Sequence, residues 1–117
     1  MDDLVTPGDI EREMMELTQR IERAPATIRE YHEKVRAARQ EYRKAYALAY
    51  SDATGTQVDR RMKADLATIR AAEDLDQAEI SYKYVMDTFD GLRTKLRALQ
   101  SVSSLLKASM FQGGGVA

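Results

Sequence analysis

Apolar and small residues recur along the first half of the chain at spacings that alternate between three and four. Such spacings put the residues on one face of a helix and are typical of a coiled-coil seam. The series comprises Ile10, Met14, Leu17, Ile21, Ala24, Ile28, Tyr31, Val35, Ala38, Tyr42, Ala45 and Ala49. Because the series stays in phase across Pro25, we favour one helix over residues 7–51 with a kink at that proline. Proline inside a helix costs about 3 kcal/mol, so two helices separated by a break there are the alternative.

The second half reads as another helix, over residues 57–109. Residues 52–56 form the turn before it, and Thr56 with Asp59 makes a variant of the capping box. The seam of this helix comprises Leu75, Ala78, Tyr82, Val85, Phe89, Leu92, Leu96, Leu99, Ser103 and Leu106. A slightly rotated stripe precedes it, formed by Val58, Met62, Leu66 and Ile69. We therefore expect a continuous helix whose packing changes ahead of Leu75.

Folding the chain back at the turn brings the two seams together. Ile10 then faces Leu99, and Val35 faces Leu75, so that large apolar residues meet. Opposite charges meet on the flanks: Glu13 faces Lys95, Lys34 faces Asp74, and Arg36 faces Glu73. The predicted fold class is therefore all-α, an antiparallel two-helix coiled-coil hairpin with arms 7–51 and 57–109.

Large apolar residues outside the seams need a further partner. Burial between two hairpins would form a four-helix bundle, so we expect a dimer or a higher oligomer. The candidate oligomer interface comprises Met15, Leu48, Ile80, Tyr84, Met86 and Leu105. The alternatives are a monomer in which these residues cover the seam edges and a three-helix bundle with a break at Pro25.

The two ends of the chain offer no face to bury. We expect residues 1–6 to be disordered and the glycine-rich residues 110–117 to form a flexible tail. The acidic start of the chain is unlike a secretory signal, and no apolar run reaches the roughly 18 residues that span a bilayer. These features predict a cytoplasmic protein without a membrane partner.

The composition argues against an enzyme. The 117 residues include no cysteine and one histidine, His32, so thiolate chemistry and a two-histidine metal site within the chain are excluded. Glycine-rich phosphate-binding motifs are missing as well. The acidic cluster from Glu73 to Glu79 lacks the spacing of a calcium loop, so we interpret it as a solvated face. We expect no catalytic residue, no metal and no cofactor.

Charge is segregated along the chain although the formal net charge is only −1. Residues 34–70 hold nine Lys and Arg against four acids, whereas the first 33 residues hold four against nine. In the hairpin, the basic segment is the turn end, where tyrosines are interleaved with it. Basic side chains beside aromatic rings can hold phosphates and unpaired bases. The candidate residues for nucleic acid or another partner are Arg36, Arg39, Arg43, Lys44, Tyr46, Tyr50, Arg60, Arg61 and Lys63.

Four segments carry a resemblance to a known group of proteins: YRKAY at 42–46, SDATGT at 51–56, RRMKAD at 60–65 and LRTKLRALQS at 92–101. Together they resemble small all-helical proteins encoded by bacteriophages and prophages, over roughly residues 31–109. The genes of that group often lie near recombination and single-strand-binding genes, so the resemblance implies an accessory role in phage DNA metabolism.

These features lead to one main functional hypothesis and two alternatives. We expect a non-enzymatic, oligomerising helical protein that contacts a phage or host protein during DNA recombination, replication or host takeover. The first alternative is direct binding of single-stranded nucleic acid by the basic turn end. The second is a structural or assembly component of a phage particle.

Overall fold

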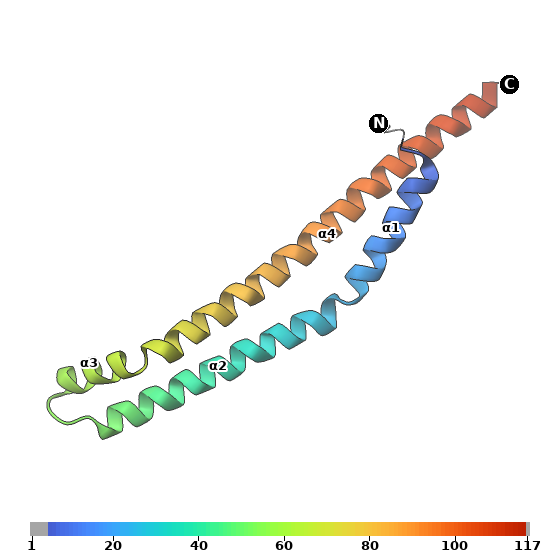
Figure 1. Cartoon of the computed structure of the whole chain (residues 1–117). Helices are drawn as coiled ribbons and strands as arrows, with labels where there is room; N and C mark the ends of the chain where they lie inside the picture. The colour runs from blue at the N-terminus through green and yellow to red at the C-terminus, as the bar shows by residue number, and fades with distance from the viewer. Residues whose placement is uncertain (1–4, 117) are drawn as a thin grey trace. The chain divides into compact units, whose positions relative to one another are not determined.

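The computed structural model is all-helical, as the sequence predicts (Figure 1). It describes residues 5–116, with side chains up to residue 110. The helices are α1 (Pro7–Glu22), α2 (Ala24–Asp52), α3 (Gln57–Ala67) and α4 (Ile69–Val116). Within that range there is no β-strand.

The helices belong to two compact units. In the first, α1 lies against the part of α4 that begins at Asp87. The second, Ala26–Met86, contains α2 apart from its first two residues, α3 and the first part of α4. In each unit, helical segments far apart in the sequence pack along their apolar stripes.

The first arm is two helices rather than one kinked helix. Helix α1 ends at Glu22, Arg23 is its C-cap, and α2 begins at Ala24. Pro25 is therefore the second residue of α2, where a missing backbone N–H costs no helical hydrogen bond and the fixed φ suits the first turn. The alternative of a break near Pro25 is confirmed, and the favoured continuous helix is wrong; the three-helix bundle stays a prediction.

The second arm is also divided, at Thr68, so the expectation of one helix over 57–109 is wrong as well. The Thr68 hydroxyl donates to the carbonyl oxygen of Ala64 at 2.7 Å, and the Thr68 N–H is shared between the carbonyls of Ala64 and Asp65. Back-bonding of this kind bends helices. Thr68 is only 2% exposed, so the bend lies in the interior of its unit. The break coincides with the change of packing expected ahead of Leu75.

Both predicted seams form the least exposed faces of their helices. Every seam residue is buried or half-buried, and Ile10, Leu17, Val35 and Val85 are each at most 9% exposed. The rotated stripe behaves differently, since all four of its residues are exposed. The spacing pattern thus identified the packed faces correctly but did not show which way α3 turns.

Ion pairs test the predicted register within each unit. In the first unit, Lys95 Nζ lies 2.6 Å from Glu13 Oε1, which confirms that pair. In the second, Lys34 pairs with Glu30 and Arg36 with Glu33, each within its own helix. Neither residue has an ion pair with Asp74 or Glu73 among the described side chains, although Lys34 and Asp74 line the same surface pocket. Between α2 and α4, Arg39 pairs with Glu79 at 3.6 Å.

The ends differ from expectation where the structure describes them. Thr6 is the N-cap of α1, and the rest of the predicted disordered segment, apart from Val5, lies outside the described residues. Helix α4 continues to Val116, past the end expected near residue 109, so most of the predicted tail is helical backbone.

None of the described helices has both the length and the apolar content required to cross a membrane.

A reciprocal capping box begins α1 and lowers the pKa of Asp9. The Thr6 N–H donates to the Asp9 carboxylate at 3.1 Å, and the Asp9 N–H donates to the Thr6 hydroxyl at 3.2 Å. Hydrogen bonds from the Thr6 backbone and side chain lower the pKa of Asp9 below its ordinary value of 3.8, with a smaller contribution from Arg12. Because the lowered pKa belongs to the folded state, the stabilisation is present above pH 3.8 and is lost as pH falls through the lowered pKa.

We predict that an NMR titration of the Asp9 carboxyl group has its midpoint below 3.8. Thr6→Val removes the side-chain hydrogen bond and keeps the backbone N–H, so it should bring the midpoint part of the way back. Asp9→Asn has no carboxyl group to protonate, so less helix should be lost on acidification, as measured by circular dichroism. A midpoint at or above 3.8 would contradict the capping geometry.

Candidate interaction surface

The connection between α2 and α3 is shaped by one glycine and one capping box. Gly55 has φ of +109°, and a Cβ there would lie 2.9 Å from the Asp59 carboxylate. Glycine is thus favoured both by backbone conformation and by space. Thr56 then begins α3: its N–H donates to the Asp59 carboxylate at 3.3 Å, and its hydroxyl accepts from the Asp59 N–H at 3.2 Å. The predicted start of this helix is confirmed.

Two of the candidate basic residues hold α3 to the end of α2. The Arg60 guanidinium lies 4.7 Å from the centre of the Tyr50 ring, and its Nε donates to the Tyr50 carbonyl oxygen at 3.3 Å. Lys63 Nζ donates to the carbonyl oxygen of Thr54 at 2.9 Å. Arg60 thus satisfies a carbonyl in the last turn of α2, where helical partners are missing, and Lys63 satisfies one in the connection that follows. Arg60 and Lys63 therefore have structural roles.

The tyrosines of α2 contact one another. The ring centres of Tyr42 and Tyr46 are 6.2 Å apart, and those of Tyr46 and Tyr50 are 6.4 Å apart with ring planes at 21°. All three side chains are half-buried, and Arg60 covers Tyr50. Tyr46 and Tyr50 thus belong to a packed row, and little of their ring surface is left for stacking on a base.

The other basic candidates divide into paired and unpaired residues. Arg36 pairs with Glu33 at 3.1 Å, and Arg39 pairs with Glu79 at 3.6 Å. Arg43, Lys44 and Arg61 are exposed, and for these three no ion pair is found among the described side chains. Three of the seven predicted basic side chains are therefore available to an outside ligand.

The outer side of α3 carries an apolar stripe, which we call the α3 stripe: Val58, Met62, Leu66 and Ile69, the last at the start of α4. Their exposed fractions are 65%, 59%, 68% and 51%. The opposite side of α3 is the packed one, since Ala64 is fully buried. Sequence reasoning found this stripe but did not include it in the candidate interface. The signal was the spacing itself, which is out of phase with the seam that follows.

The predicted oligomer interface is exposed but does not form one cluster. Met15, Leu48, Ile80, Tyr84 and Leu105 are 60–71% exposed, whereas Met86 is half-buried. Glu79 pairs with Arg39, and Ile80 is the next residue along α4. Arg39 lies nine residues before Leu48 in α2. At 1.5 Å per residue this separates them by roughly 14 Å along the helix. Leu48 and Ile80 therefore belong to different parts of the surface of their unit.

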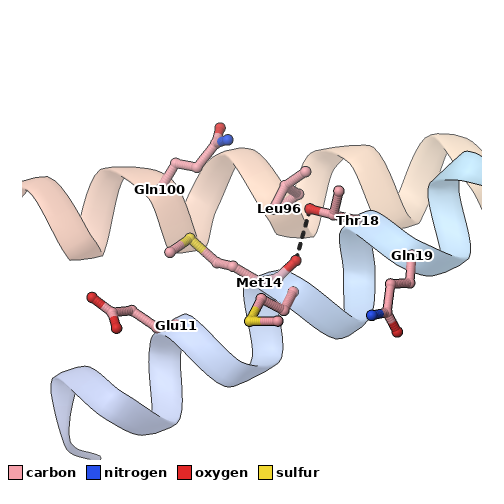
Figure 2. A pocket seen from close by; sticks show the side chains of 7 residues that line it. Glu11, Met14, Thr18, Gln19, Leu96 and Gln100 are labelled. Carbon is pink, nitrogen blue, oxygen red and sulfur yellow. Dashed lines mark hydrogen bonds between the residues drawn. The ribbon is translucent and has the colours of Figure 1, made fainter.

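The first unit has a shallow apolar groove of its own between α1 and α4 (Figure 2). Met14, Met15 and Thr18 line it from α1, and Leu96 and Gln100 line it from α4. The Thr18 hydroxyl donates to the Met14 carbonyl oxygen at 2.8 Å, so its polar atom is turned to its own helix. Methionine side chains adapt to the shape of apolar partners. Met15, predicted to lie in an oligomer interface, borders this groove.

The chain matches no protein-family model, no curated protein and no solved structure. The surfaces themselves are therefore what points to a function. Among the described residues, no three His, Cys, Asp or Glu side chains gather as metal ligands would. His32 packs its ring 5.5 Å from that of Tyr82. The prominent features are apolar stripes and unpaired basic side chains, which suit contacts with macromolecules.

We predict that Arg60→Ala destabilises the fold by about 1–2 kcal/mol, because it removes a cation–π contact and a charged hydrogen bond to a helix end. Urea unfolding followed by circular dichroism measures this. Arg43→Ala, an exposed position without an ion pair, should change the free energy of unfolding by less than about 0.5 kcal/mol. Equal effects of the two substitutions would contradict the structural role of Arg60.

Proposed function

We propose that this chain is a non-enzymatic interaction protein that pairs its helix faces with a second copy of itself and with another macromolecule. The observation that carries the proposal is the small core. Six hydrophobic residues are buried, two of them alanines, whereas twelve large hydrophobic residues are exposed among those the structure describes. Contiguous exposed apolar patches such as the α3 stripe mark interaction sites.

The free energy available from these residues is large enough for association. Complete burial of one Val, Leu, Ile or Met side chain contributes about 1.5–3 kcal/mol. Micromolar binding corresponds to about 8 kcal/mol, and part of the gain offsets lost translational and rotational freedom. Several side chains buried together therefore suffice. In the arrangement we propose, the two units are parts of one antiparallel hairpin, and two hairpins form a four-helix bundle.

The resemblance to phage-encoded helical proteins supports a choice of partner. We propose that the oligomer contacts a phage or host protein of DNA recombination or replication, as an accessory factor. Catalysis has no part in this proposal.

Self-association is tested by sedimentation velocity from micromolar to millimolar concentration. We expect a reversible oligomer, and we expect Leu48→Asp and Ile80→Asp each to shift it towards the monomer by placing a charge on an apolar surface. Gln40→Asp, an exposed polar position on α2, is the matched control and should leave the distribution unchanged. A wild-type monomer throughout this range would contradict the proposal. Open-ended assembly would support the alternative of a phage structural or assembly component.

Direct binding of single-stranded nucleic acid is a second candidate, supported by the unpaired Arg43, Lys44 and Arg61. Replacing all three by Gln should abolish a mobility shift of single-stranded DNA, whereas replacing Arg12, Arg20 and Arg29 should not. The apparent affinity should fall steeply with salt, because each phosphate contact releases a counterion. Absence of a shift at low salt would eliminate this candidate.

A further inference from the structure

Helix α3 exposes its larger apolar side chains and packs its smaller ones. The stripe residues Val58, Met62 and Leu66 are 59–68% exposed, while the side facing the rest of the unit presents Ala64 and the Arg60 side chain that covers Tyr50. A surface helix normally buries the side with the larger apolar residues. The α3 stripe therefore lacks a partner within its unit.

We propose that two copies of the chain pair through their α3 stripes, with the two α3 helices antiparallel and a two-fold axis between Met62 and Leu66. This inference rests on the proposed self-association and adds the α3 stripe to the surfaces that take part in it. A two-fold interface uses the same patch on both copies, so the patch must be complementary to itself.

The apolar side chains meet this requirement. The stripe runs over consecutive turns at spacings of four, four and three. In the antiparallel arrangement, Val58 faces Ile69 of the partner subunit, and Met62 faces Leu66 of the partner subunit. Each copy thus places an apolar residue opposite an apolar residue along the whole stripe, a length of about 16 Å at 1.5 Å per residue.

The charges beside the stripe select the antiparallel direction. Arg61 and Asp65 lie one turn apart on the same edge of the stripe, and both are exposed. In the antiparallel pair, Arg61 faces Asp65 of the partner subunit, and the two-fold axis repeats this contact. In a parallel pair, arginine would face arginine and aspartate would face aspartate. Charge complementarity thus favours a second, antiparallel copy.

The same charges argue against an anionic lipid surface as the occupant. Amphipathic helices that bind such surfaces carry Lys and Arg along their polar edges. The edges of the α3 stripe instead carry both signs, with Asp59 and Asp65 beside Arg61 and Lys63. Four side chains per copy make an interface below about 1,200 Å², the range of weak and reversible complexes. The dimer should therefore depend on concentration.

The test is a charge exchange at Arg61 and Asp65, measured by sedimentation equilibrium. Arg61→Asp alone and Asp65→Arg alone should each raise the dissociation constant by roughly tenfold, because symmetry changes two contacts at once. The double variant should regain wild-type association. An equimolar mixture of the two single variants should also associate, since each supplies the charges that the other lacks. Arg29→Asp, a charge reversal on α2, is the control and should have no effect.

A second measurement fixes the direction of pairing and uses the absence of native cysteine. Under mild oxidation, a mixture of Met62→Cys and Leu66→Cys chains should form the mixed disulfide faster than either variant forms its own. Preferential pairing of Met62→Cys with itself would indicate a parallel dimer and overturn the proposal. If the wild-type protein forms an oligomer whose dissociation constant changes with none of the charge exchanges, the α3 stripe is not an interface, while the proposed self-association stands. A wild-type monomer that binds anionic vesicles or another protein through the α3 stripe would overturn both the α3 pairing and the proposed self-association.

Discussion

The constraint on which this structure depends is that each helix has one narrow apolar stripe. Two helices that share a seam cover each other on one side only, so most seam residues are half-buried and few are fully enclosed. Leu17 and Val35 are among the few large side chains that reach the interior. A core of this kind has little surplus stability, and twelve large hydrophobic residues of the described chain are left exposed.

Several basic side chains of this chain stabilise its local structure and are therefore not available for binding. The basic segment around the α2–α3 connection first appears to be a ligand surface, yet Arg60 and Lys63 satisfy carbonyl groups at the end of α2 and in the connection. Helix ends leave carbonyls without partners, and a cation is well suited to them. What is left for an outside ligand is a smaller set, Arg43, Lys44 and Arg61.

The bend at Thr68 connects local structure with the surface that we assign to self-association. A threonine hydroxyl bonded to the carbonyl four residues earlier competes with the regular helix. With the helix divided there, α3 packs by Ala64 and turns its larger residues outward. Met62 and Leu66, which precede this interrupted turn, consequently lie on the surface.

The sequence by itself determined the all-helical class, both seams, the turn at Gly55 and the start of α3 at Thr56, because helical periodicity and capping are local properties. The Glu13–Lys95 pair also followed, since it lies on the flank of a regular seam. Only the tertiary structure decided that the chain breaks before Pro25 and at Thr68, that Arg39 meets Glu79, and that the α3 stripe faces outward. Threonine is tolerated within a helix and proline within its first turn, so the local sequence leaves open whether a helix continues or ends there. A small bend then moves every later residue relative to its neighbour on the facing helix.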